Sequence, residues 1–275
     1  DPVRAADDIQ VVLHHDHRMA VGEQGVEGVG HAGRRRGEQA HHAGQKANHE
    51  AGAVEFTEHK IITLPDNHGK MEARVLKKYL DDFMADGNRN HAVHPGLVYI
   101  TFPTELGTLY TARELDDIYQ VCRNFDIPLY IDGARLGYGL MAEGCDITLP
   151  YLARHCDVFY IGGTKIGALC GEAVVFTHGN AHKHFFSIQK QHGAVIAKGA
   201  LIGLQFEALF TDNLYFQLAR HAIEKAMQMK QMFQEHGYEF YMDSPTNQQF
   251  VILPNEKMQR LEKYVQFTHW GPYDN

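Results

Sequence analysis

The sequence lacks long apolar runs, paired cysteines and an excess of positive charge. No apolar run reaches the roughly 20 residues that a membrane-spanning helix needs. The formal net charge of −8 over 275 residues argues against a protein that mainly binds nucleic acid. No secretory signal stands at the start of the sequence. We therefore predict a cytoplasmic protein with neither a membrane nor a nucleic-acid partner.

The four cysteines form neither a CxxC pair nor a set with zinc-ligand spacing. They stand at Cys122, Cys145, Cys156 and Cys170. We predict reduced thiols in or near the core, as is usual for a cytosolic protein.

The first 46 residues contain no Phe, Tyr or Trp and a single leucine, Leu13. They are rich in Gly, His, Arg and Glu, so this segment cannot bury much apolar surface. Only residues 9–13 have the composition of a short strand. We predict that residues 1–46 are disordered or foreign to the fold, for instance a frameshifted or wrongly joined start.

Histidines are frequent in this segment, at His14, His15 and His17 and again at His41 and His42. Adjacent residues of a strand point to opposite faces, so the run HHDH cannot easily close around one ion. A solvated segment is favoured over a metal site, and no metal is predicted.

Strands alternate with helices after residue 47. Predicted strands cover 59–65, 96–103, 127–132, 158–163 and 171–176, and predicted helices cover 71–87, 111–126 and 148–157. Thr111 and Glu114 form a capping-box pattern at the start of the second helix. Because several strands are continuously apolar, we predict an α/β fold with a mostly parallel sheet covered by helices on both faces.

The last part of the chain has a different pattern. Residues 203–237 are strongly helical, 238–254 read as strand, turn and strand, and 256–265 as a helix. The sequence therefore predicts a large domain over 47–202, then a connecting helix and a partial small α+β domain over 203–275.

Two charged residues stand where strands of the predicted sheet end. Asp132 ends one strand and Lys165 follows the next, about one strand–helix–strand unit later. Ligands of open parallel sheets bind beyond the carboxyl ends of the strands, so both side chains can point into one crevice. The alternative is a plain ion pair.

Neighbouring residues favour a ligand site over the ion pair. Glycines at 162, 163 and 167 let the backbone approach a ligand closely. Thr164 offers a hydroxyl and an N–H to an anion. Arg135 adds a second cation to the edge of this crevice, which we call the rim: the segments that follow Asp132 and precede Lys165. Lys190 and Lys198 are predicted to be solvated instead.

These residues suit a pyridoxal phosphate site. A lysine forms a Schiff base with the cofactor's aldehyde if its pKa is lowered by desolvation or nearby cations. A carboxylate opposite the pyridine nitrogen keeps that nitrogen protonated, so that the ring accepts electrons. Lys165 and Asp132 are the candidates for these two roles.

The chain resembles the threonine aldolase / β-eliminating lyase family of fold-type I pyridoxal phosphate enzymes. The resemblance covers about residues 47–275 and is carried by PLYIDGARLGYGL, CDVFYIGGTKIGALCGEAVVF, LVYITFPTELGTLY and SPTNQQFVILP. The combination of DGARL with GGTKxGALxGEAVV is its most specific part.

The resemblance implies roles for the residues at matching positions. Lys165 would bind the cofactor covalently, Asp132 would pair with the pyridine nitrogen, and Arg135 would contact the phenolic oxygen of the ring. Thr164 would lie near the phosphate.

Glu50 matches an acidic position near the cofactor, and Thr104 with Glu105 matches the loop after the preceding strand. For Glu50, Thr104 and Glu105, a cap or turn contact is the alternative.

The function implied by the resemblance is cleavage of a β-hydroxy-α-amino acid, such as threonine, into glycine and an aldehyde. Other β-eliminating lyases or an aminotransferase remain open on the same site. The family also implies a homodimer or homotetramer acting on a small amino-acid substrate.

Some family features have no counterpart in this sequence. No glycine-rich phosphate loop precedes residue 47, and Gln45 stands where the family places a histidine. An arginine that binds the substrate carboxylate is expected beyond the last residue. A catalytically inactive, truncated family member is therefore the second hypothesis.

Overall fold

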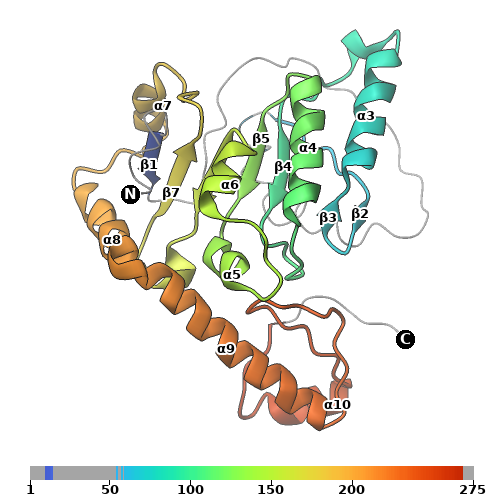
Figure 1. Ribbon diagram of the computed structural model, residues 1–275, viewed down its shortest axis with the longest axis vertical. Helices are drawn as coiled ribbons and strands as arrows, with labels where there is room; N and C mark the ends of the chain where they lie inside the picture. The colour runs from blue at the N-terminus through green and yellow to red at the C-terminus, as the bar shows by residue number, and fades with distance from the viewer. Residues whose placement is uncertain (1–9, 15–53, 55–56, 58, 269–275) are drawn as a thin grey trace.

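The structure of the protein is a computed structural model that describes residues 10–14, 54, 57 and 59–268, with only the backbone described for 10–14. Figure 1 shows a central sheet flanked by helices, with one long helix leading away from it to the C-terminal segment. None of the described helices is long and apolar enough to cross a membrane.

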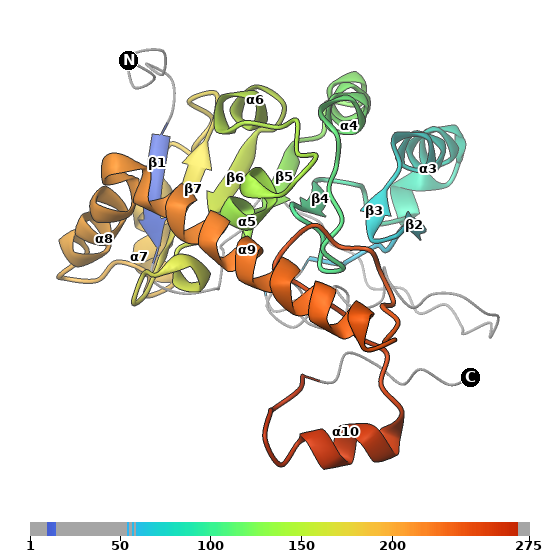
Figure 2. The ribbon, with the colours of Figure 1, turned by 60° about the horizontal axis from the view of Figure 1, so that its bottom comes forward.

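The central sheet has the strand order β1-β7-β6-β5-β4, and Figure 2 shows these strands side by side. The strands are β1 (Gln10–His14), β4 (Val98–Thr101), β5 (Leu129–Asp132), β6 (Val158–Ile161) and β7 (Glu172–Phe176). Strands β4, β5 and β6 are parallel, whereas β7 runs antiparallel to β6 and β1 antiparallel to β7. The predicted mostly parallel α/β sheet is confirmed.

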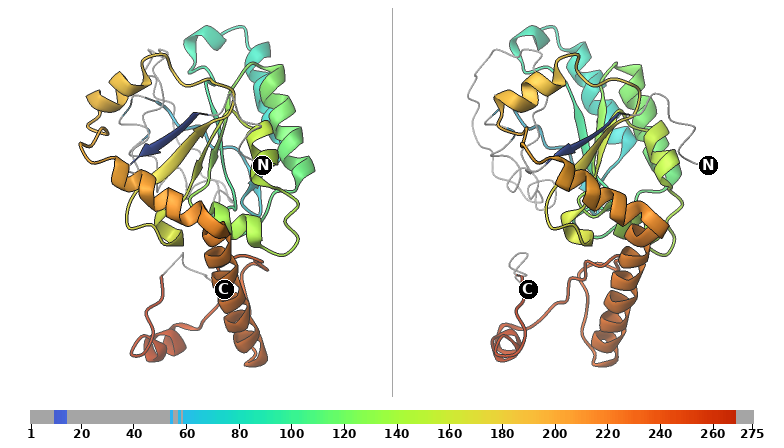
Figure 3. Two further views of the ribbon diagram at one scale, coloured as in Figure 1. Left: turned by 60° about the vertical axis from the view of Figure 1, so that its left-hand side comes forward. Right: turned by 90° about the vertical axis from the view of Figure 1, so that its left-hand side faces the viewer.

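One face of the sheet belongs to the main hydrophobic core. Its side chains alternate along the paired strands, as pleating requires. They are Val98, Ile100, Leu129, Ile131, Phe159, Ile161, Ala173 and Val175. Figure 3 shows α3 (Ala73–Ala85), α4 (Ala112–Asn124) and α6 (Leu149–Arg154) on one side of the sheet. Leu115, Ile118 and Cys122 of α4 pack into the same core.

Two predicted helix starts are confirmed. Thr111 caps α4 through the N–H of Glu114, and the Glu114 side chain binds back to Thr111, which completes the capping box. Thr148 caps α6, and Pro150 lies in the first turn. All four cysteines are free, with Cys122 and Cys156 buried, as the sequence predicts.

The predicted strand at 59–65 is wrong. These residues have no regular secondary structure, since none of the described strands pairs with them. A short hairpin follows instead, formed by β2 (Asp66–Asn67) and β3 (Lys70–Met71). Its turn places His68 and Gly69 at φ of 53° and 80°, a conformation that glycine adopts without strain.

The predicted helix over 203–237 is two helices. α8 (Ala200–Phe210) and α9 (Leu214–Glu235) are separated by η3 (Thr211–Asn213), where Asp212 and Asn213 have positive φ. Asp and Asn tolerate this conformation better than most residues.

The remaining helices are η1 (Arg89–His91), α5 (Leu136–Met141), η2 (Thr164–Ile166), α7 (Phe185–Gln191) and α10 (Asn255–Leu261). Helix α9 packs against α5 and extends beyond the sheet towards α10 (Figure 1). The strand pair predicted at 238–254 is reduced to one antiparallel bridge between Phe240 and Val251. The division into domains at residues 46 and 202 stays a prediction.

Candidate functional site

The loops that follow β5 and β6 are joined by backbone contacts. The Gly162 N–H donates to the Gly133 carbonyl over 2.9 Å. A Cβ atom on Gly133 would meet the Tyr160 carbonyl oxygen at 1.9 Å, and one on Gly162 would meet the Ala134 oxygen at 2.3 Å. Only glycine allows this approach. The loop after Asp132 and the loop that carries Lys165 therefore lie side by side, as the sequence predicts.

Asp132 ends β5 as a buried carboxylate with 8% exposure. Its Oδ1 accepts the Ala134 N–H over 2.9 Å, and its Oδ2 accepts the Tyr99 hydroxyl. Tyr160 also hydrogen-bonds to this carboxylate. Burial, followed by the charge of Asp132, raises the pKa of both Tyr99 and Tyr160, so both phenols keep the protons that they donate.

The second face of the sheet carries polar groups next to Asp132. Strand register places six residues with polar side chains on this face: Tyr99, Thr101, Tyr130, Asp132, Tyr160 and Glu172. The ring centroids of Tyr99 and Tyr130 lie 5.2 Å apart, and those of Tyr130 and Tyr160 lie 6.4 Å apart. The Thr101 hydroxyl oxygen is buried and has no hydrogen-bond partner among the residues that the structure describes. A buried hydroxyl of this kind is rare and marks a position where a ligand can bind.

Lys165 lies in η2, directly after β6, and its side chain is exposed. Its backbone carbonyl accepts the hydroxyl of Tyr138. Among the described residues the amine of Lys165 takes part in no hydrogen bond or ion pair. The amine is therefore available to a ligand at this edge of the sheet.

Arg135 precedes α5 and is half-buried. Burial raises the pKa of Tyr138, and the positive charge of Arg135 opposes that shift. The Tyr138 hydroxyl binds the backbone carbonyl of Lys165, so α5 contacts the segment that carries this lysine. The segments that carry Asp132, Arg135 and Lys165 therefore adjoin one another after β5 and β6, and a shared site for the three side chains stays a prediction.

The hydroxyl of Thr164 donates to Oε1 of Glu172 over 2.8 Å. The neighbouring Gly163 N–H donates to Oε2 of the same carboxylate. The hydroxyl proton of Thr164 is therefore directed to a side chain of the protein. Contact between Thr164 and a phosphate stays a prediction.

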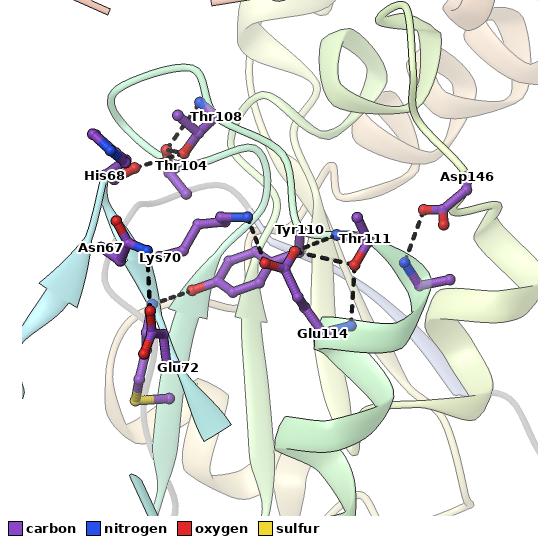
Figure 4. Close-up of polar contacts among 12 residues, drawn as sticks. Asn67, His68, Lys70, Glu72, Thr104, Thr108, Tyr110, Thr111, Glu114 and Asp146 are labelled. Carbon is purple, nitrogen blue, oxygen red and sulfur yellow. Dashed lines mark hydrogen bonds and ion pairs between the residues drawn. The ribbon is translucent and has the colours of Figure 1, made fainter. Parts of the chain in front are cut away.

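Thr104 is 2% exposed and follows β4. Its hydroxyl shares a hydrogen bond of 2.7 Å with the Thr108 hydroxyl and also accepts the Thr108 N–H. The Thr108 hydroxyl reaches the His68 carbonyl in the hairpin (Figure 4). These bonds are the turn contact that the sequence left open as an alternative, and a cofactor contact of Thr104 stays a prediction.

Figure 4 also shows how the hairpin is held against the start of α4. The Met71 N–H donates to the Tyr110 hydroxyl, and Lys70 forms an ion pair of 2.6 Å with Glu114. Burial would raise the pKa of Glu114, but the Lys70 and Thr111 contacts outweigh it and lower the pKa. The loop after β4 is therefore fixed from both sides.

The structure does not describe some of the predicted residues. Glu50 and the histidines at 15, 17, 41 and 42 fall outside the described residues, and only the backbone of His14 is described. Lys190 and Lys198 are exposed, which agrees with the prediction that they are solvated.

Sequence reasoning missed five polar residues on the face of Asp132: Tyr99, Thr101, Tyr130, Tyr160 and Glu172. A signal was present, because Tyr99 and Thr101 alternate along β4 with buried apolar residues. Once the pairing of Thr101 with Asp132 is known, the alternation of side chains along β4 places Tyr99 and Thr101 on the same face of the sheet as Asp132. Glu172 carried no such signal, since it depends on the antiparallel return of β7.

Comparison with solved structures identifies the class of the fold. The structure matches that of threonine aldolase from Leishmania major with a TM-score of 0.78 and 37% identity, over 84% of this chain and 66% of that one. A pyridoxal phosphate-bound C–S lyase from Staphylococcus hominis matches with a TM-score of 0.51 at 14% identity, over 79% of this chain and 54% of that one, which shows a shared fold alone. The chain has the fold of the fold-type I pyridoxal phosphate enzymes.

The beta-eliminating lyase family model matches residues 28–256, so the chain belongs to the beta-eliminating lyase family. The match begins inside the segment 1–46 that the sequence set apart. The family resemblance predicted from the site motifs is confirmed.

Two curated relatives are low specificity L-threonine aldolases. The chain is 26% identical over 215 residues to that of a Pseudomonas species (strain NCIMB 10558), covering 77% of this chain and 61% of the relative. It is 28% identical over 175 residues to the low specificity L-threonine aldolase of Pseudomonas aeruginosa, covering 63% of this chain and 49% of that relative. The chain thus spans about half to three fifths of the length of these relatives.

Proposed function

We propose that the chain binds pyridoxal phosphate at the rim formed after β5 and β6 and cleaves a β-hydroxy-α-amino acid such as threonine into glycine and an aldehyde. The observation that carries the proposal is the bond from Gly162 to Gly133, which holds the loops of Lys165 and Asp132 together. The threonine aldolase relatives support the choice of reaction.

The residues present fit this cofactor. Lys165 offers an amine without a partner in the described part of the chain, and Asp132 offers a buried carboxylate. The Thr101 hydroxyl, which lies on the face of Asp132 and is unpaired within the described ranges, would be an additional polar contact for a bound ring. When bound, the cofactor supplies an electron sink for the bond that breaks at the substrate α-carbon.

Each residue of the rim would have a separate task. The Lys165 amine would hold the cofactor covalently and yield its place to the amino group of the substrate. The Asp132 carboxylate would keep a proton on the pyridine nitrogen, while Tyr99 and Tyr160 orient it through their hydroxyls. The Arg135 guanidinium would bind the phenolic oxygen.

The test begins with absorbance. Pyridoxal phosphate is added to the purified chain, and a visible band that is lost in Lys165→Ala but kept in Lys190→Ala is expected. Lys190 is a suitable control because it is an exposed lysine on α7. A chain that gives no lysine-dependent band would refute the proposal.

Product analysis decides which reaction takes place. Incubation with threonine is expected to release glycine and acetaldehyde in equal amounts. The family's description as beta-eliminating lyases favours elimination as the second candidate, which would give a keto acid and ammonia instead.

We further propose assembly as a homodimer or homotetramer. The support is a group of exposed apolar side chains near the rim and α8: Leu169 is 93% exposed, Leu201 61% and Leu204 58%. Sedimentation analysis of the purified chain tests this proposal, and a monomer at micromolar concentration would contradict it.

A further inference from the structure

Three side chains from three elements hold the segment that ends at Lys165. The Tyr215 hydroxyl of α9 donates to the Gly162 carbonyl over 3.0 Å and accepts the Gly137 N–H. The Tyr138 hydroxyl of α5 donates to the Lys165 carbonyl. Glu172 of β7 binds the two residues between these carbonyls. The segment from Gly162 to Lys165 is therefore held at each of its four residues by a polar contact from another element.

Glu172 makes the central pair of these contacts. It is 8% exposed, and each of its oxygens accepts one hydrogen bond, from the Gly163 N–H and from the Thr164 hydroxyl. A carboxylate is costly to bury unless hydrogen bonds stabilise its charge. Both donors belong to the two residues before Lys165. The hydrogen bonds that stabilise the charge of Glu172 therefore also order this loop.

The antiparallel course of β7 explains how Glu172 reaches the loop. Ala173 pairs with Ile161, so the start of β7 lies at the carboxyl end of β6. Gly163 is also closely surrounded, because a Cβ atom there would meet Phe206 at 2.8 Å and the Gly171 carbonyl at 2.9 Å. The Gly163 N–H can therefore approach the carboxylate only with glycine at this position.

We propose that Glu172 is a positioning residue for Lys165. It acts through Gly163 and Thr164, and it orders the loop before any ligand binds. Ordering in advance lowers the entropy lost when the amine is brought to a reacting carbonyl. The inference rests on the proposed function only in that Lys165 is taken to bind pyridoxal phosphate covalently. The ordering of the loop is independent of it.

Backbone order in the cofactor-free chain is the first measurement. Hydrogen–deuterium exchange resolved at single amides is compared between the native chain, Glu172→Ala and Glu172→Gln. In Glu172→Ala the amide of Gly163 is expected to exchange about tenfold faster. Glu172→Gln is expected to exchange within about twofold of the native chain, because its amide can accept from Gly163 and donate to the Thr164 oxygen.

Thr177→Val provides a matched control from the opposite end of β7. Thr177 is 6% exposed, and its hydroxyl donates to the Cys156 carbonyl over 2.6 Å. This variant also loses a buried hydrogen bond, so it corrects for general destabilisation. If Glu172→Ala changes exchange at residues 162–166 no more than Thr177→Val does, the positioning role is refuted.

Trapping of the cofactor is the second measurement. Pyridoxal phosphate is added to each variant at increasing concentration, borohydride fixes what is bound, and the fraction attached to Lys165 is found by peptide mass. Half-saturation is expected at about tenfold higher concentration in Glu172→Ala and within about twofold in Glu172→Gln. Equal half-saturation in all three proteins would overturn the proposal.

The two measurements separate this inference from the proposed function. If the native chain attaches no cofactor at Lys165, the proposed function fails, and the exchange data alone decide the ordering role of Glu172. If Glu172→Ala does not fold, Thr164→Val replaces it, since that variant removes one of the two contacts and keeps the shape. Unchanged exchange at Gly163 in Thr164→Val would then refute the inference.

Discussion

The parallel strands β4, β5 and β6 define an amino end and a carboxyl end of the central sheet. Both ends hold buried carboxylates, but the groups around these carboxylates differ. At the amino end, Asp157 is 5% exposed and forms an ion pair of 3.1 Å with Arg123 while accepting the Leu129 N–H. At the carboxyl end, Glu172 and Asp132 accept hydrogen bonds from backbone N–H groups and hydroxyls. At the amino end, the guanidinium of Arg123 therefore neutralises the charge of Asp157.

The cations of the carboxyl end remain available. Within the described ranges, neither Lys165 nor Arg135 forms an ion pair. At the amino end, Thr177 and Asn180 bind the Asp157 carbonyl and complete a closed network. The network at the amino end stabilises the fold, and the cations at the carboxyl end fit the anionic cofactor proposed above.

The largest effect on chemistry is expected from Asp132→Asn. The amide keeps the shape of the carboxylate but cannot stabilise a proton on the pyridine nitrogen. Cleavage of threonine should fall by about a hundredfold or more, the order seen when one preorganised electrostatic contact is removed. Activity is measured as glycine release. Asp117→Asn, at an exposed position on α4, serves as the control. Equal activity of the two variants would contradict a catalytic role for the carboxylate at the carboxyl end.

The largest loss of stability is expected from Gly133→Ala. Its Cβ atom would meet the Tyr160 carbonyl at 1.9 Å, so the loops after β5 and β6 must separate. The free energy of unfolding should fall by about 3 kcal/mol in urea titration, near the upper end for overpacking. Gly96→Ala, with no atom within 4 Å, should change it by less than about 0.5 kcal/mol. Similar values for both glycines would contradict this account of the rim.

Asp157→Asn should affect stability alone. Loss of the charge leaves Arg123 without its partner, and because the Arg123 side chain is 39% exposed, the cost is expected to be about 2 kcal/mol. Attachment of pyridoxal phosphate to Lys165 should stay within about twofold of the native chain. The exposed pair of Lys77 and Asp81 offers a control, since Asp81→Asn should cost less than about 0.5 kcal/mol. A strong loss of cofactor binding in Asp157→Asn would show that the two ends are coupled.

The smallest effect concerns the Cys122 thiol, near the amino end. Burial, and then the charge of Asp157, raises the pKa of Cys122 from 9.0 to about 12. Its stabilising contribution is therefore full below pH 9 and is lost as the pH rises towards 12, because the unfolded thiol ionises first. At pH 8, iodoacetamide should label the half-buried Cys170 and leave Cys122 unmodified until urea unfolds the chain. Rapid labelling of folded Cys122 would contradict a closed amino end.

Local signals in the sequence were sufficient for much of the sheet and for the positions of Asp132 and Lys165 at the ends of β5 and β6. The apolar runs before Asp132 and Lys165 predicted β5 and β6, and their parallel pairing follows from the helix between them. Thr111 and Glu114 predicted the start of α4 because a capping box depends on only four residues.

Features that depend on distant contacts were not predictable in the same way. The role of Glu172 arises because β7 turns back along β6, and nothing in its neighbours in sequence indicates that return. The break between α8 and α9 falls at Asp212 and Asn213, without a glycine or proline to mark it. Residues 59–65 have an apolar composition typical of a strand but no partner strand in the described part of the fold.

Peptide mapping of the covalently attached cofactor tests the central claim most directly. The chain is incubated with pyridoxal phosphate, reduced with borohydride and digested, and the modified lysine is identified by mass. We expect modification at Lys165 in near-stoichiometric amount, with little at the exposed Lys190 and Lys198. Modification spread evenly over the exposed lysines, or absent from Lys165, would contradict the assignment of this rim as the cofactor site.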